Sequence, residues 1–204
     1  MKSLLSSITL ACVVIAGGAF ADGEKPSNGF YIGALLGKSS IDTGVNTVVG
    51  AVLEEEDTAS VFFVGSEINE NISVEGFYAN FGEASLTGDN GDTFKFNGTT
   101  YQFNTSATVK LSASSMGIAA KMRFDITDKF DGFIKGGWHW WESEETLAVG
   151  TASASTKSDG NDLLIGLGVE YDISEKVALI AGYDRYKFNE DSVTFLNGGI
   201  RIRF

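Results

Sequence analysis

The stretch "DLLIGLGVEY" (162–171) decides the fold class, because its side chains alternate between two kinds. One face carries large apolar residues at Leu163, Ile165, Leu167, Val169 and Tyr171, and the other carries Asp162, Gly166, Gly168 and Glu170. Alternation with a period of two is typical of a β-strand whose two faces meet different surroundings. A soluble sandwich also alternates. Here, however, the polar face is both charged and rich in glycine, which favours a crowded barrel lumen and indicates that the apolar face meets lipid.

The same pattern recurs along the chain and predicts eight strands. They cover residues 29–40, 58–68, 72–84, 108–125, 130–143, 161–172, 177–188 and 193–204. Each strand has about ten residues or more, which is the length that a tilted strand needs to cross a bilayer. Short connections at 69–71, 126–130 and 173–177 alternate with long polar ones at 41–57, 85–107 and 144–160. The sequence therefore predicts an all-β, eight-stranded antiparallel up-and-down transmembrane β-barrel.

Aromatic residues on the predicted lipid face stand at two heights, as expected at the two interfaces of a membrane. One set lies beside the short turns or near the chain ends, and the two tryptophans lie eight to ten residues further along one strand. The predicted lipid-facing aromatic girdle comprises Phe30, Phe124, Phe130, Trp138, Trp140, Tyr171 and Phe204.

The first 21 residues have the features of a secretory signal peptide. Lys2 precedes an apolar run from Leu10 to Ala16, and the small residues Ala19 and Ala21 predict cleavage after Ala21, which leaves the barrel domain at 22–204. A lipid anchor on Cys12 is the alternative, but the residues around it fit a lipobox poorly. Because Cys12 is the only cysteine, no disulfide is expected in the mature chain. The formal net charge of −12 argues against a nucleic-acid partner, which requires a basic face.

The segment from 85 to 113 departs from the simple pattern. Val109, Leu111 and Ala113 are out of phase with Met116, so we expect either a β-bulge near Ser114-Ser115 or a strand end above the bilayer. The hairpin 93–103 contains Asn97-Gly98, which is typical of a type I′ turn. Its aromatic residues Phe94, Phe96, Tyr101 and Phe103 would share one face. That face either contacts an extracellular partner or packs on other loops.

Several strings resemble the OmpA-like outer-membrane barrels of Gram-negative bacteria: "GFYIGALLG", "VGSEINENISVEGFY", "AAKMRFDITDKF" and "LGVEYDISEKVALIAGYDRY". The resemblance implies an outer-membrane location, contact with membrane lipid and lipopolysaccharide, insertion by the assembly machinery and a monomer. It also implies an assembly signal in the last strand, at Ile200, Ile202 and Phe204. The family's peptidoglycan-binding domain has no counterpart after the eighth strand, so a barrel-only member is expected.

The resemblance further implies a lumen cluster of charges. Glu75, Lys121 and Glu170 match the two glutamates and the lysine of the family, whereas the position of its arginine holds Ile180. Arg123, Lys135 and Arg201 lie on predicted lumen faces and are the expected substitutes for that arginine. The lumen of eight strands is narrow enough for side chains to fill it. We therefore expect a salt-bridged plug, although a narrow gated ion path is the alternative.

No enzyme, metal site or cofactor is predicted. His139 is the only histidine, and neither Gly137 nor Trp141 beside it on the same face is a nucleophile. The acidic runs at 54–57 and 88–92 lack the spacing of a calcium loop. The leading interpretation is an outer-membrane barrel with a structural, envelope-integrity or adhesin-like surface role, and the alternative is a small porin for ions or small solutes.

Overall fold

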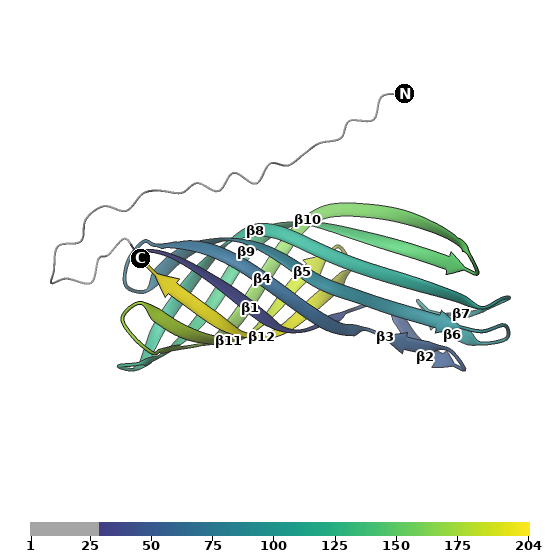
Figure 1. Cartoon of the computed structure of the whole chain (residues 1–204), viewed down its shortest axis with the longest axis horizontal. Helices are drawn as coiled ribbons and strands as arrows, with labels where there is room; N and C mark the ends of the chain where they lie inside the picture. Colours follow the sequence, from purple (N-terminus) through teal and green to yellow (C-terminus); the bar gives the residue numbers. More distant parts are fainter. Residues whose placement is uncertain (1–28) are drawn as a thin grey trace, which may run out of the picture.

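The computed structural model describes residues 29–204, so the predicted signal peptide lies outside the described part. Within it the chain is all β, and eight long strands form a ring (Figure 1). They are β1 (Phe30–Ile41), β4 (Glu56–Glu67), β5 (Ile72–Gly88), β8 (Ala107–Thr127), β9 (Phe130–Val149), β10 (Ala152–Asp172), β11 (Val177–Phe188) and β12 (Asp191–Arg203). No helix in this part of the chain is long and apolar enough to cross a membrane.

The ring closes between the first and the last strand. Each long strand pairs antiparallel with its neighbours in the chain, β5 pairs with β8, and β1 pairs with both β4 and β12. Tyr31 stands opposite Arg203, and the backbone N–H of Phe204 donates a 2.9 Å hydrogen bond to the carbonyl of Phe30. The predicted eight-stranded barrel is thus confirmed, and closure leaves no open edge in the ring.

Two strands extend far beyond their predicted ends. Residues 144–160, predicted as a loop, belong almost entirely to β9 and β10, which pair without interruption from Tyr171↔Phe130 to Ala152↔Val149. The prediction was wrong because residues 151–159 are all exposed, so neither face required apolar side chains. Figure 1 shows this hairpin, together with β8, projecting well past the ends of β11 and β12.

Four short strands lie at the same end of the barrel. β3 (Val52–Glu54) pairs with β5, and β2 (Val45–Val49), β6 (Thr93–Phe96) and β7 (Thr99–Gln102) form a separate three-stranded sheet. The predicted turn between β6 and β7 is confirmed: Phe96 pairs with Thr99, and Asn97 and Gly98 have φ angles of 47° and 80°. Two consecutive positive φ angles are the mark of a type I′ turn.

The predicted bulge near Ser114-Ser115 is wrong in its position. Within β8, Ala113, Ser115 and Ala119 are all buried, so this strand keeps one phase throughout. The register shift lies instead on β5, between Asn80 and Glu83, where Gly82 adopts a φ of 73°. Val109 and Leu111 are on the inward-facing side of β8. Apolar residues occupy these inward positions because the interior is apolar at that height.

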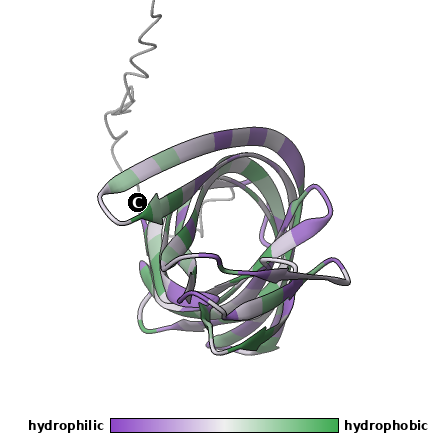
Figure 2. Cartoon of the chain, turned by 90° about the vertical axis from the view of Figure 1, so that its right-hand side faces the viewer, coloured by the Kyte–Doolittle hydropathy of each residue, from purple (hydrophilic) through white to green (hydrophobic). Residues whose placement is uncertain are grey.

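The two faces of the ring differ as the alternation predicted. In the end view of Figure 2, the ribbons change between hydrophobic and hydrophilic residues along each strand. Leu163, Ile165 and Leu167 are exposed on the outer face of β10, and Leu164 and Glu170 are buried on the inner face. The short turns, the start of β1 and Phe204 lie at one end of the barrel, which corresponds to the periplasmic end of this architecture.

Candidate functional site: the filled lumen

The periplasmic half of the lumen holds a network of paired charges. Glu170, only 1% exposed, lies at its centre. One of its carboxylate oxygens accepts a 2.6 Å hydrogen bond from Lys121 Nζ, and the other lies 3.0 Å from Arg201 Nη2 and 3.8 Å from Arg123 Nη1. A buried carboxylate in contact with three cations is strongly compensated, as a buried charge must be.

A second carboxylate, Glu67, binds the same network from the periplasmic rim. Its Oε1 atom lies 2.5 Å from Arg203 Nη2, 3.0 Å from Arg123 Nη2 and 3.6 Å from Arg201 Nη1. Glu67 was not predicted as a site residue. The signal was available, because Glu67 follows Phe63 and Gly65 on the inner phase of its strand.

Glu75 completes this network above Glu170. Lys121 Nζ lies 2.9 Å from Glu75 Oε1, and the hydroxyl of Tyr31 donates a 2.9 Å hydrogen bond to the same oxygen. Five of the six predicted cluster residues are therefore in one network, namely Glu75, Lys121, Arg123, Glu170 and Arg201. Arg123 and Arg201 both contact Glu170, while Ile180, at the position implied for an arginine, is buried.

Lys135, the sixth predicted residue, has a separate partner. Its Nζ atom lies 3.0 Å from Asp184 Oδ2, which also accepts a 3.1 Å hydrogen bond from Asn197. Gly166 makes room for this pair, because a Cβ at that position would stand 2.1 Å from Asp184 Oδ1 and 2.7 Å from Lys135 Cε. Gly166 of β10 thus leaves space for charged side chains from both neighbouring strands, β9 and β11.

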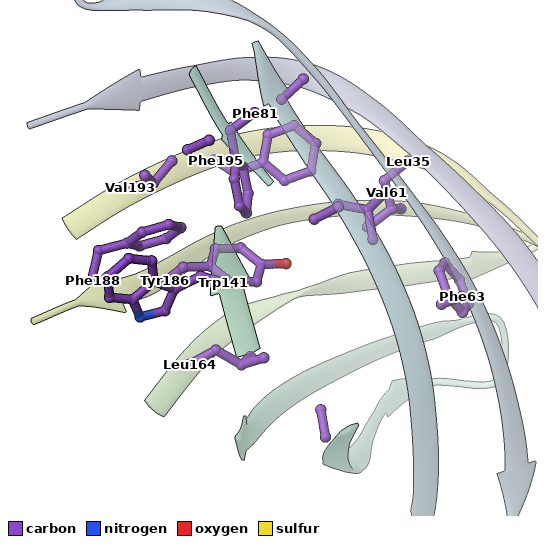
Figure 3. Packing of buried hydrophobic residues seen from close by; sticks show 14 of the residues in the cluster. Leu35, Val61, Phe63, Phe81, Trp141, Leu164, Tyr186, Phe188, Val193 and Phe195 are labelled. Atoms are coloured by element: carbon purple, nitrogen blue, oxygen red, sulfur yellow. The ribbon is translucent and has the colours of Figure 1, made fainter. Parts of the chain in front are cut away.

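Above the charges, aromatic rings pack against one another in the extracellular half of the lumen. We call Phe81, His139, Trp141, Tyr186 and Phe188 the aromatic layer. Tyr186 lies 4.7 Å from Phe81 and 5.5 Å from His139 between ring centroids, and Phe188 lies 5.1 Å from Trp141 and 6.0 Å from Phe81. Figure 3 shows Phe81 of β5, Trp141 of β9, and Tyr186 and Phe188 of β11 inside the barrel, together with Val193 and Phe195.

His139 lies inside this layer, away from solvent. Its Nδ1 atom is 2.7 Å from the hydroxyl of Ser115 on the neighbouring strand β8. Both residues are buried, with His139 at 0% exposure. The pair has the hydrogen bond of a nucleophile and its base, and the rings of Tyr186 and Phe188 each lie 5.5 Å from the imidazole. Among residues 29–204, no cluster of His, Cys, Asp or Glu has the arrangement of a metal site.

The predicted aromatic residues of the outer surface fall into two groups. Six of the seven girdle residues are exposed on the outer face: Phe30, Phe124, Trp138, Trp140, Tyr171 and Phe204. Phe130 is half-buried. Of the hairpin residues, Phe103 is buried against Gly88, Phe94 is half-buried and stacks on Tyr101 at 5.4 Å, and Phe96 and Tyr101 are exposed.

Residues 25–191 match the family model of the OmpA-like transmembrane domain. The chain belongs to this family. It is therefore an outer-membrane protein of a Gram-negative bacterium, as the resemblance implied. No curated protein sequence matches the chain.

Solved structures of other OmpA-like barrels share the fold at low sequence identity. Neisserial surface protein A has a TM-score of 0.56 and 16% identity, over 86% of this chain and 97% of that chain. The β-barrel domain of Pseudomonas aeruginosa OprF has a TM-score of 0.52 and 10% identity, over 87% and 98%. The attachment invasion locus protein Ail of Yersinia pestis, in complex with the heparin analogue sucrose octasulfate, has a TM-score of 0.51 and 12% identity, over 87% and 97%.

Proposed function

We propose that this OmpA-like barrel is a non-conducting outer-membrane protein with a structural or surface-interaction role. The observation that supports the proposal is the succession of two groups of side chains inside the ring, the charge network and the aromatic layer. The interior of eight strands is just wide enough for side chains to fill it. An ion would have to separate the contacts of Glu170 with three cations and then pass rings packed at centroid distances of 4.7–6.0 Å.

Conductance across a planar bilayer tests the closed lumen. We expect no steady conductance from the purified barrel, and a rise for Tyr186→Ala combined with Phe188→Ala, which removes two rings of the aromatic layer. The matched control is Tyr183→Ala, which removes a ring of the same strand from the outer face. Steady wild-type conductance that changes on Lys121→Gln substitution would favour the small porin instead.

A surface-interaction role is supported by the exposed rings at the extracellular end. Phe96 on β6 and Tyr101 on β7 are exposed on the two sides of a two-residue turn, in a sheet separate from the barrel wall. The segments at this end are rich in acidic residues, namely Glu54, Glu55, Glu56, Asp57, Asp89, Asp92, Glu142, Glu144 and Glu145, of which Glu56 and Glu144 are paired with lysines. Such a surface repels sulfated glycans of the kind bound by Ail, so we propose an apolar or cationic protein partner.

Adhesion measurements test this role. Cells that display the barrel should adhere to a protein-coated surface or to one another more than cells without it. Phe96→Ser with Tyr101→Ser should remove most of the gain, whereas Leu147→Ser, an exposed apolar change on the β9–β10 hairpin, should not. Equal adhesion of cells with and without the barrel would leave only the structural role.

We also propose that the barrel is a monomer and that Ile200, Ile202 and Phe204 form the signal read by the outer-membrane assembly machinery. All three side chains are exposed on the outer face of β12, where a partner could reach them before the ring closes. An enzymatic role has no support in the geometry, because the Ser115–His139 pair is enclosed. A molar mass in detergent equal to one chain is the expected result for the monomer.

A further inference from the structure

The outer face of β11 ends in two cations at the top of its lipid-facing row. Leu179 and Tyr183 are exposed on this face, and Arg185 and Lys187 follow on the same face toward the extracellular end. Arg185 and Lys187 lie two and four residues beyond Tyr183, and each residue of a strand adds about 3.4 Å. An aromatic ring followed by cations is typical of a side-chain row that leaves the hydrocarbon and enters the headgroup layer.

Neither cation has an ion-pair partner among residues 29–204. Among the described residues, no ion pair joins Arg185 or Lys187 to a carboxylate, whereas Lys38, Lys110 and Lys157 at the same end each have a glutamate partner. This is unexpected in a chain with a formal net charge of −12.

The surroundings of Arg185 place it at the membrane border. Its partner in the ladder on β10 is Ile165, which is 63% exposed and belongs to the lipid-facing row. A guanidinium beside lipid-exposed aliphatic groups turns toward the interface and finds a counter-charge there. The available counter-charge at that level is an anionic headgroup of the outer leaflet.

Hydroxyl groups extend the site across two further strands. Arg185 pairs with Thr194 on β12, and Thr194 pairs with Ser40 on β1. The outward phase of all three strands puts these side chains in one row. We call Arg185, Lys187, Thr194 and Ser40 the β11 patch. A guanidinium, an ammonium and two hydroxyls all donate hydrogen bonds, which is the donor set that a phosphate ester prefers.

We propose that the β11 patch binds a phosphate group on the saccharide headgroup of an outer-leaflet glycolipid. Arg185 makes the bidentate contact to the phosphate oxygens, and Lys187 supplies the second charge from the headgroup side. The site belongs to the outer wall, so it does not depend on whether the lumen conducts. A soluble polyanion is the less favourable source, because the formal net charge of −12 repels it.

Co-purified lipid measured by native mass spectrometry tests the site. The barrel is refolded in mild detergent and incubated with diphosphorylated lipid A or with the same lipid after phosphatase treatment. We expect the wild type to retain the phosphorylated form about tenfold better, the effect of one or two charge-assisted contacts. Arg185→Gln with Lys187→Gln should bind both forms equally, since only the phosphate contact is lost.

The control is Lys95→Gln with Lys129→Gln, which removes two cations from exposed positions outside the patch and should preserve the tenfold preference. Both double variants change outward side chains, and their folding is checked by the gel mobility of unboiled samples. The proposal fails if Arg185→Gln with Lys187→Gln keeps the preference, or if inorganic phosphate at equal concentration competes as well as the lipid does, which would indicate a soluble ligand.

Discussion

Replacement of Glu170 by glutamine should destabilise the barrel more than any change of an exposed charge. Glutamine keeps the size of the side chain, so the loss is electrostatic. Lys121 would retain Glu75 and Arg123 would retain Glu67, but Arg201 would keep only its longer contacts, 3.6 Å to Glu67 and 3.5 Å to Asp172. Breaking a buried ion pair in this way costs about 3–5 kcal/mol of unfolding free energy.

Urea unfolding of the barrel in lipid vesicles, followed by tryptophan fluorescence, measures this loss. At a slope of about 2 kcal/mol per molar urea, the unfolding midpoint should fall by roughly 2 M. The control is Glu144→Gln, whose partner Lys157 lies 3.5 Å away with 39% and 72% of the two side chains exposed. This variant should change the unfolding free energy by less than about 1 kcal/mol. Equal midpoints for the two variants would refute the central role of Glu170.

Three further changes test other parts of the structure. Gly166→Ala should lower the unfolding free energy by about 1–3 kcal/mol, because the added Cβ pushes apart the Lys135–Asp184 pair. Gly136→Ala should have little effect, since the nearest atom to a Cβ at that position is 3.9 Å away. The urea unfolding midpoints of the two variants measure the difference. Deletion of Phe204 should lower the amount inserted in cells far more than the midpoint of barrels already folded, and normal insertion would contradict the assembly signal. Gly98 has a φ of 80°, and no atom lies within 4 Å of a Cβ placed there. Gly98→Val should therefore destabilise the β6–β7 turn through backbone strain alone, by about 1–3 kcal/mol. The expected result is faster protease cleavage of that hairpin, while the barrel stays intact.

The barrel itself could be predicted because lipid imposes a strict pattern on one face. Where strands cross the membrane, every second residue must be apolar, so Leu163, Ile165 and Leu167 reveal the phase of the strand. Above the membrane this constraint ends, and residues 151–159 gave no signal that they continue a strand. There β9 and β10 are joined by backbone pairing and by polar side-chain contacts such as Glu144–Lys157 and Thr146–Ser155, and neither kind of contact requires alternating apolar residues.

The charged half of the lumen was easier to predict than the aromatic half. Lysine, arginine and glutamate on an inner phase are conspicuous, and five of the six expected residues are in one network. The aromatic layer was missed because Tyr186 and Phe188 look like further lipid-facing residues until the phase of β11 is known. The bulge at Gly82 hid the layer further, since it reverses the phase of β5 just beyond Phe81.

The unequal strand lengths give the barrel a slanted mouth. β8, β9 and β10 have 20 or 21 residues, whereas β1, β11 and β12 have 12 or 13. The extracellular edge of the barrel is therefore low along β11, β12 and β1 and high along β8, β9 and β10, which form the tall wall (Figure 1). Molecules that diffuse within the saccharide layer meet the low rim first, while antibodies and phages that arrive from the medium meet the tall acidic wall.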